Sequence, residues 1–350
     1  MERDLSRLTI LENPAQRIQL DDALVAKHQI IDVRSSAEYH AGTIPGAANV
    51  PLFDEDERAV IGTLYRHAGH EQAIDKGFDF VREKLAEIVT AFEPFSQSVL
   101  TVFCARGGMR SRSVVNLLLQ SGYQAFQLEG GYKKHRNDVL DLLDNFKPKL
   151  IVIHGLTGTG KTRILQKLDN SIDLEDLARH RSSLFGGLDR EPSNQRNFES
   201  RLAEVIKTLG EEPYFIEGES RKIGRVYTPK PLAMAMKEAI LIMVHSSIET
   251  RISRIIEDYP VTDEAVLGQI DNILRSLKQK LGTVQVERMC ALLKEGNLEE
   301  LVRTLLVDYY DRRYNRSMGS YHYELELSSE DIEEAAGKLT AFRHSLLKKS

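Results

Sequence analysis

One cysteine stands where its thiol could act as a nucleophile. Cys104 follows the short apolar run Val99–Phe103 and precedes two adjacent glycines and a helical pattern that starts at Ser111. A strand, a tight loop and a helix in this order direct backbone N–H groups and a helix dipole at the thiol. These groups favour the reactive thiolate, whereas a buried structural cysteine is the alternative. The candidate residues of the loop, for the thiolate or for an oxyanion beside it, are Arg106, Gly107, Gly108, Arg110 and Ser111.

A second loop has the residues needed to hold a phosphate chain. It follows the apolar run 149–154 and precedes a helical pattern, and its sequence G-x-x-x-x-G-K-T in that setting is typical of a P-loop. Backbone N–H groups would surround the phosphates, the lysine would reach the terminal one, and the threonine could bind Mg²⁺. A loop kept only for packing is the alternative. The candidate residues are Gly155, Thr157, Gly158, Thr159, Gly160, Lys161 and Thr162.

Acidic and basic side chains follow the P-loop. The strand expected from Pro213 ends at Glu217 and Glu219, where a P-loop protein usually has an aspartate, so phosphate binding is better supported than Mg²⁺ binding or ATP hydrolysis. A basic cluster beside a strand end of an α/β sheet lies where ligands bind, and it predicts a surface for nucleic acid. A solvated charged face is the alternative. The cluster comprises Arg179, His180, Arg181, Arg221, Lys222 and Arg225.

A further pair of arginines, Arg251 and Arg254, is spaced to share one face of a helix. Small P-loop kinases place such pairs near phosphates. Surface charges on an amphipathic helix are the alternative.

Parallel strands that end at a common edge of a sheet would bring the candidate site residues into place. The hydrophobic pattern of the sequence predicts such strands. Apolar runs indicate strands at 29–34, 99–103, 149–154, 213–217, 239–245 and 322–327, with a strand and turn at 173–177. Helical patterns occupy 20–24, 35–40, 111–119, 133–149, 194–208, 247–256 and 330–347. We therefore expect an α/β protein with domains at 1–135 and 150–350, a linker helix at 136–149, and a helical insert at about 260–316.

Composition narrows the class of protein. The 350 residues are 41% hydrophobic and 28% charged, as in a globular protein of two domains. Two cysteines give no disulfide framework and fit a reducing cytoplasm, with Cys290 expected to pack inside a helix. The N-terminal residues do not resemble a signal peptide, and no apolar run suits a membrane span. The net charge of −5 neither favours nor excludes nucleic acid. We expect a cytoplasmic monomer.

Four separated motifs in residues 15–137 resemble the rhodanese family: Asp32-Val-Arg34, Glu38-Tyr39, Gly42-x-Ile-Pro-Gly-Ala47 with Asn49-Val-Pro51, and Gly122–Tyr132. The resemblance implies a rhodanese-like doubly wound domain in which the Asp-x-Arg corner supports the loop of Cys104. One departure is the longer loop. Cys104 and Arg110 have the Cys-x5-Arg spacing of loops that surround a tetrahedral oxyanion, as in cysteine phosphatases, which favours a phosphate-like ligand.

The two loops together with Phe215–Gly224 resemble the tRNA 2-selenouridine synthases over nearly the whole chain. That resemblance implies a selenotransferase and geranyltransferase acting on the wobble 2-thiouridine of tRNA. Geranyl diphosphate would alkylate the sulfur, and selenium from selenophosphate would then replace the S-geranyl group. No tightly bound cofactor is implied beyond an optional Mg²⁺ at Thr162. A nucleotide-dependent kinase with a sulfur-carrier domain and a cysteine phosphatase or sulfurtransferase remain the alternatives.

Overall fold

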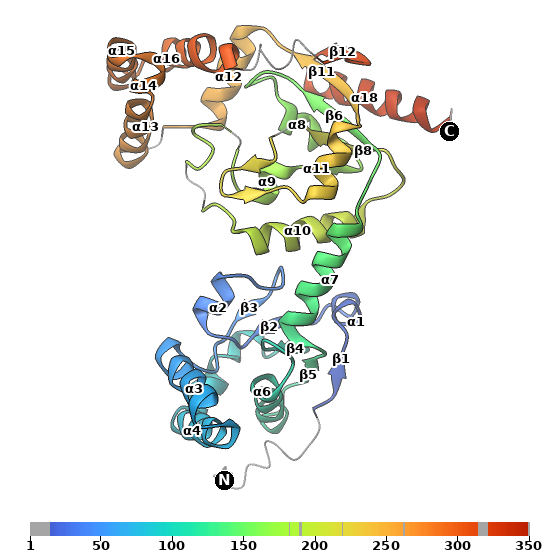
Figure 1. Cartoon of the computed structure of the whole chain (residues 1–350), viewed down its shortest axis with the longest axis vertical. Helices are drawn as coiled ribbons and strands as arrows, with labels where there is room; N and C mark the ends of the chain where they lie inside the picture. The colour runs from blue at the N-terminus through green and yellow to red at the C-terminus, as the bar shows by residue number, and fades with distance from the viewer. Residues whose placement is uncertain are drawn as a thin grey trace. The chain divides into compact units, whose positions relative to one another are not determined.

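The computed structural model describes residues 15–181, 183–188, 191–218, 220–261, 263–313 and 321–348, and its backbone forms two compact units, 1–142 and 143–350 (Figure 1). The boundary lies inside helix α7 (Gly131–Asn145). Helix α7 overlaps the linker helix predicted at 136–149 and starts five residues before it. Each unit is an α/β fold, as the sequence predicts.

The first unit is built on a parallel sheet of five strands in the order β1-β5-β4-β2-β3. Its central strand β4 is buried at every residue, as expected for a parallel strand covered on both faces. The strands are β1 (Arg17–Ile18), β2 (Gln29–Asp32), β3 (Ala48–Asn49), β4 (Leu100–Phe103) and β5 (Ala125–Leu128). The helices are α1 (Leu20–Val25), α2 (Ser36–His40), α3 (Glu55–His67), α4 (His70–Glu83), α5 (Leu85–Thr90), the 3₁₀ turn η2 (Glu93–Phe95) and α6 (Met109–Gln120).

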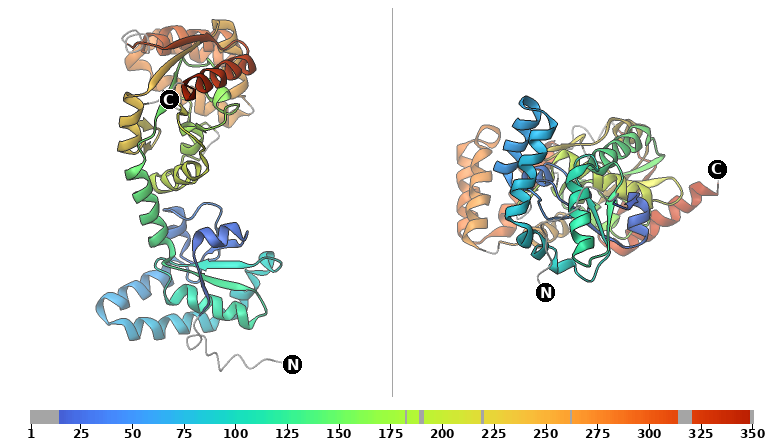
Figure 2. Two further views of the ribbon diagram at one scale, coloured as in Figure 1. Left: turned by 90° about the vertical axis from the view of Figure 1, so that its right-hand side faces the viewer. Right: turned by 90° about the horizontal axis from the view of Figure 1, so that it is seen from below.

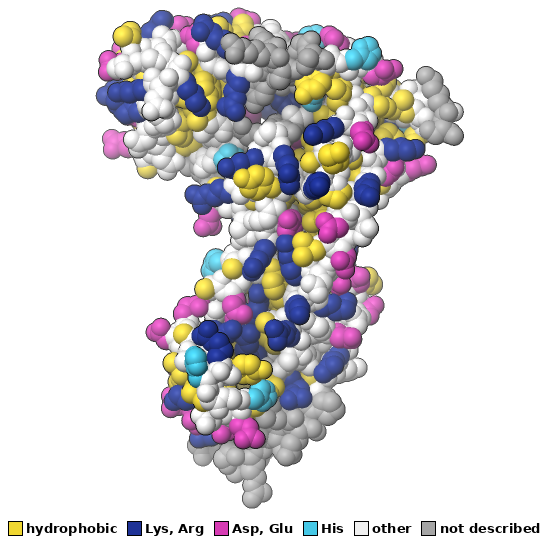
Figure 3. Space-filling model, in the orientation of Figure 1, with side chains coloured by type: hydrophobic (Ala, Val, Ile, Leu, Met, Phe, Trp, Pro, Cys, Tyr) yellow, Lys and Arg dark blue, Asp and Glu magenta, His cyan; other side chains and the backbone are white. Residues whose placement is uncertain are grey.

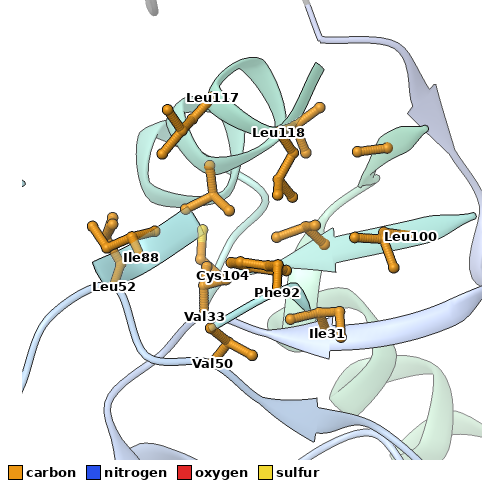
Figure 4. Packing of buried hydrophobic residues seen from close by; sticks show 14 of the residues in the cluster. Ile31, Val33, Val50, Leu52, Ile88, Phe92, Leu100, Cys104, Leu117 and Leu118 are labelled. Carbon is orange, nitrogen blue, oxygen red and sulfur yellow. The ribbon is translucent and has the colours of Figure 1, made fainter. Parts of the chain in front are cut away.

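Cys104 lies within the hydrophobic core of this unit. It packs in one cluster with Val33, Leu100 and Phe92 and with α6 residues such as Leu117 (Figure 4). The cysteine is 3% exposed. Burial of this kind would suit a purely structural cysteine, so the polar groups around its sulfur decide its chemistry.

The sequence pattern did not predict the helical pair α3 and α4, which lie side by side in both views of the ribbon (Figures 1 and 2). Asp54 and Glu57 form a reciprocal capping box at the start of α3. Gly69, with a φ of 99°, supplies the left-handed residue that precedes α4. Helix α3 has no fully buried residue, so its apolar pattern is weak in the sequence.

The second unit is a parallel sheet in the order β12-β11-β6-β8-β7, with a two-stranded antiparallel ribbon of β9 and β10. The strands are β6 (Leu150–His154), β7 (Ser171–Ile172), β8 (Tyr214–Glu217), β9 (Lys222–Ile223), β10 (Val226–Tyr227), β11 (Ile240–His245) and β12 (Leu325–Ser328). The helices outside the insert are α8 (Lys161–Leu165), α9 (Leu174–Ala178), α10 (Gln195–Thr208), α11 (Lys230–Lys237), α12 (Ile248–Asp258) and α18 (Ile332–Leu347).

The strand and turn predicted at 173–177 is wrong. The strand is β7, just before this segment, and the segment itself is α9. The Asp173 carboxylate accepts a hydrogen bond from the backbone N–H of Asp176 and caps the helix, and acidic residues in the first turn favour this helix end. The local cap outweighs the apolar alternation of the short segment.

The segment predicted as a helical insert contains α13 (Glu264–Ser276), α14 (Lys278–Leu281), α15 (Thr283–Lys294), α16 (Leu298–Leu305) and the π-helical turn η3 (Leu306–Asp311). Cys290 is buried in the hydrophobic cluster that these helices share with α12, in agreement with its predicted packing role. The described part of the chain contains no helix with the length and hydrophobicity that a membrane crossing requires.

Candidate active site

The sulfur of Cys104 is surrounded by hydrogen-bond donors. The backbone N–H of Gly108 and the hydroxyl of Ser111 both donate to Sγ, each at 3.3 Å. Helix α6 begins at Met109, two residues earlier than predicted, so its first turn lies beside the sulfur. Burial alone would raise the pKa of the Cys104 thiol. The Ser111 hydrogen bonds, the Arg110 charge and the Arg106 backbone N–H outweigh it and hold that pKa below its ordinary value.

Gln127, which the sequence pattern did not single out, holds the loop in place. Its buried side-chain amide donates to the carbonyls of Gly107 and Gly108, both at 2.9 Å, and to the Ser111 hydroxyl at 3.0 Å. The Ser111 oxygen is thereby held toward the sulfur. Gln127 lies on β5, and only the pairing of β5 with β4 brings it to the cysteine loop, so no local signal could have identified it.

The turn between β5 and α7 presses directly against the cysteine loop. Gly131 has a φ of 57°, and a Cβ there would clash with the Cys104 carbonyl and the Gly107 backbone. The backbone N–H of Tyr132 donates to the Cys104 carbonyl at 3.0 Å. Glycine is therefore required at 131 by the close approach of two backbones.

The Asp-x-Arg corner supports this turn, as the rhodanese resemblance implies. Asp32 and Arg34 form a buried ion pair, and the Arg34 guanidinium lies 4.0 Å from the centre of the Tyr132 ring. Arg34 also donates to the Gly42 carbonyl at 2.7 Å. The corner thus reaches the cysteine loop through Tyr132.

Two arginines of the cysteine loop have different surroundings. Arg110 donates to the Glu38 carboxylate at 2.9 Å, and Arg58 donates to the same oxygen at 3.2 Å. Burial opposes ionisation of Glu38, but the two arginines lower its pKa overall. Arg106 is exposed. Glu38 therefore holds Arg110 beside the loop while Arg106 lies at the surface.

The P-loop is confirmed between β6 and α8. Gly158 and Gly160 have positive φ values of 85° and 87°, which only glycine adopts readily. Lys161 lies at the first position of α8 and its ammonium donates to the Gly155 carbonyl at 2.9 Å. The Thr159 hydroxyl donates to the Leu156 carbonyl at 2.8 Å and tightens the turn.

Arg251 and Arg254 are buried against the P-loop, so the alternative of surface charges is wrong. Arg251 donates to the Thr157 carbonyl at 2.8 Å and is paired with Asp311. Arg254 donates to the Thr159 carbonyl at 3.0 Å and to the Ser329 carbonyl at 2.7 Å. Both guanidinium groups thus bind carbonyl oxygens of the P-loop and hold its backbone in place.

Of the two acidic residues predicted at the end of β8, the structure describes Glu217. Glu217 is fully buried and accepts from the backbone N–H of Glu175 at 2.8 Å, and the Thr162 hydroxyl is 3.4 Å from the Glu175 carboxylate. Glu219 lies outside the described residues. Glu175, which the sequence pattern did not single out, therefore connects the second motif to the P-loop.

His154, at the end of β6 beside the P-loop, is another residue that the sequence pattern did not single out. Burial and the Lys161 charge lower the pKa of His154 to about 4, and its Nδ1 lies 3.1 Å from the Tyr323 hydroxyl. Its imidazole is neutral at physiological pH.

The predicted tRNA-binding residues separate into two groups. His180 packs against Gly224, where a Cβ would meet its ring, and Arg181 donates to the Asp258 carbonyl at 2.6 Å and lies over the Tyr259 ring. These two side chains hold the segment together. The exposed members of the cluster are Arg179, Arg221, Lys222 and Arg225.

Like charges gather beside Arg179. Burial lowers the pKa of Arg201 on α10, and the charge of Arg179 lowers it further. Two guanidinium groups close enough to repel each other would be stabilised by an anion between or beside them.

The fold and the two loops define a class: a rhodanese-like domain with an activated cysteine, joined in one chain to a P-loop domain. A family profile described as rhodanese-like domain matches residues 17–138, and one described as tRNA 2-selenouridine synthase AAA domain matches residues 148–341. The chain belongs to the tRNA 2-selenouridine synthase family.

Relatives over most of the chain agree with this assignment. A tRNA 2-selenouridine synthase of Nitrosomonas europaea is 34% identical over 78% of this chain and 74% of its own length. One of Pseudomonas syringae pv. syringae is 33% identical over 84% of this chain and 86% of its own length. A solved N-terminal domain from Clostridium difficile 630 is 43% identical, with a TM-score of 0.34, and covers 36% of this chain and 99% of that one.

The hydrogen-bond donors around Sγ predict how the alkylation rate of Cys104 depends on pH. Since the pKa of Cys104 is lowered, its alkylation by iodoacetamide should reach half its maximal rate below the pH of about 8.5 of an ordinary thiol. Ser111→Ala removes a donor to the thiolate and should move this midpoint upward. Peptide-level mass spectrometry measures it, with Cys290, whose pKa burial and Asp271 raise, as the slow internal reference.

Ser113→Ala is the matched control, because Ser113 lies on the same helix and forms no hydrogen bond with the sulfur. Its midpoint should equal that of the unaltered protein. An unchanged midpoint in Ser111→Ala would show that the hydroxyl does not stabilise the thiolate.

Proposed function

We propose that this protein converts the wobble 2-thiouridine of tRNA to 2-selenouridine in two steps, S-geranylation and selenation. The observation that supports the proposal is the presence, in one chain of this family, of a P-loop and of a Cys-x5-Arg loop with hydrogen-bond donors at its sulfur. The two loops lie in different units, and we assign one step to each.

The P-loop serves the first step. The sulfur of 2-thiouridine attacks C1 of geranyl diphosphate, the carbon–oxygen bond breaks, and diphosphate leaves while N3 of the base loses a proton. Negative charge develops on the leaving group, and Lys161 with the loop N–H groups of residues 155–162 stabilises it there. The buried Arg251 and Arg254 keep the loop carbonyls turned away from the anion.

Mg²⁺ fits beside this loop as an optional ion. Mg²⁺ binds through one or two protein oxygens and the phosphates of its substrate, and the Thr162 hydroxyl and the Glu175 carboxylate would supply these oxygens. The described residues contain no cluster of three or more His, Cys, Asp or Glu side chains suited to a metal ion. When bound, Mg²⁺ would add positive charge at the diphosphate.

Cys104 serves the second step. Selenium of selenophosphate attacks C2, the C2–S bond breaks, and geranylthiolate leaves. The Cys104 thiolate then attacks phosphorus and breaks the selenium–phosphorus bond. Water hydrolyses the resulting cysteinyl phosphate to inorganic phosphate and supplies the protons that N3 and geranylthiol take up. A Cys-x5-Arg loop with donors at Sγ suits this phosphoryl transfer.

The two assignments are tested together by mass analysis of tRNA nucleosides after incubation with geranyl diphosphate and selenophosphate. Cys104→Ser should accumulate S-geranyl-2-thiouridine and form no 2-selenouridine. Lys161→Ala should lose geranylation by about 10²–10³-fold, since removing one charged contact to a developing anion costs about 2–4 kcal/mol. Loss of geranylation in folded Cys104→Ser, or normal geranylation by Lys161→Ala, contradicts the division of labour.

The same incubation separates the alternatives. A nucleotide-dependent kinase would consume ATP over many turnovers without tRNA, and a cysteine phosphatase would hydrolyse a simple phosphoester through Cys104. We expect neither activity.

The exposed basic residues predict how tRNA binding depends on salt. Arg225→Ala removes one phosphate contact and should weaken binding, with the slope of log K against log salt reduced by about one. Fluorescence anisotropy with labelled tRNA measures both quantities. Lys278→Ala, which removes another exposed positive charge from the helical insert, should change neither. Equal effects in the two variants would place the tRNA surface elsewhere.

A further inference from the structure

A cavity of ≈ 670 Å³ opens beside Cys104 in the first unit. Its walls come from α3, α4, the cysteine loop and α6, and Cys104 itself is part of the lining. A phosphate or selenophosphate ion fills only a small part of such a volume. Cavities of this size hold an organic group of several to many carbon atoms.

The lining combines an apolar wall with positive charge. The apolar side chains are Leu52, Phe53, Ile61, Ile74, Phe78, Val81, Val114 and Leu117, and the basic ones are Arg58, Arg66, His70, Arg106 and Arg110. None of the described residues that line the cavity is acidic. In Figure 3, basic side chains gather beside apolar ones over the region of α2 and α3. The lining therefore suits an apolar group attached to a phosphate-bearing molecule.

Glycines on both helices leave room for the side chains that line the cavity. Gly62 lies inside α3 and Gly77 inside α4, and neither has a positive φ. Glycine inside a helix is destabilising relative to alanine, and the backbone at these positions does not require it. Both glycines, together with Ala73, line the cavity. A Cβ at Gly62 would lie 2.8 Å from the Arg58 guanidinium and one at Gly77 would lie 3.4 Å from the Phe53 ring, so their small size leaves room for these two lining side chains.

We infer that this cavity binds the geranyl chain that the RNA sulfur carries into the second step. The inference rests on the proposed function. A branched ten-carbon chain has no polar atoms and matches the apolar wall, while the arginines neutralise RNA phosphates next to it. Because Cys104 lies in the same wall, binding of the chain brings the sulfur and C2 of the base to the thiolate loop. Binding of the geranyl chain also distinguishes the geranylated base, as the substrate of this step, from an unmodified base.

The test compares two short anticodon RNAs, one with S-geranyl-2-thiouridine and one with S-methyl-2-thiouridine, given selenophosphate as co-substrate. Ile61→Trp fills the cavity and should raise KM for the S-geranyl RNA at least tenfold, with the S-methyl RNA changed less than twofold. Val60→Trp is the matched control, because Val60 is the neighbouring residue on α3, is 42% exposed and does not line the cavity. It should behave like the unaltered protein.

A second filling variant, Ala73→Leu, guards against a folding defect, and the thermal midpoints of all variants are compared. Equal losses for both RNAs, or no loss for either, in folded Ile61→Trp and Ala73→Leu would overturn the inference. Loss of the first step in these variants would also overturn it, because geranyl diphosphate would then be the occupant. If the unaltered protein fails to selenate the S-geranyl RNA, the proposed function itself is wrong.

Discussion

A thiolate can exist inside a protein core only where hydrogen-bond donors replace the water it has lost, and the first unit is arranged around this constraint. Gly108 and Ser111 donate to the buried sulfur of Cys104. Gln127 holds the donors in place from a neighbouring strand. The Gly131 turn and the Asp32–Arg34 corner in turn fix the loop from behind. Without the Ser111 hydrogen bonds and the Arg110 charge, burial of Cys104 would favour the neutral thiol.

The second unit meets a related constraint, but its anion is an external ligand rather than one of its own side chains. Its loop must present N–H groups to an anion, so its carbonyls need other partners, and Arg251 and Arg254 supply them from inside the core. Both units thus use a strand, a tight loop and a helix start, with a second layer that fixes the loop. In the proposed mechanism, the same local geometry serves nucleophilic chemistry in one unit and leaving-group stabilisation in the other.

The sequence predicts those parts of the structure that local signals determine. The continuous apolar strands β4 and β6, the glycines of both loops and the start of each following helix are local, and their positions are confirmed to within a few residues. The segment after Asp173 was misassigned because a helix cap outweighed its alternation. The role of Gln127 and the burial of Arg251 and Arg254 depend on contacts between segments that are far apart in the sequence, so no local pattern predicts them. The cavity could not be predicted, because it is formed by the space that α3 and α4 leave uncovered.

The central claim is that each loop performs one step. A protein with a defective P-loop should therefore still carry out the second step when it is given the S-geranyl intermediate. The most direct measurement supplies synthetic S-geranyl-2-thiouridine RNA and selenophosphate, without geranyl diphosphate, and quantifies 2-selenouridine by mass spectrometry. Lys161→Ala should form 2-selenouridine at close to the rate of the unaltered protein, whereas Cys104→Ser should form none. Failure of folded Lys161→Ala to use the intermediate would contradict the claim, because the P-loop would then be needed for selenation as well.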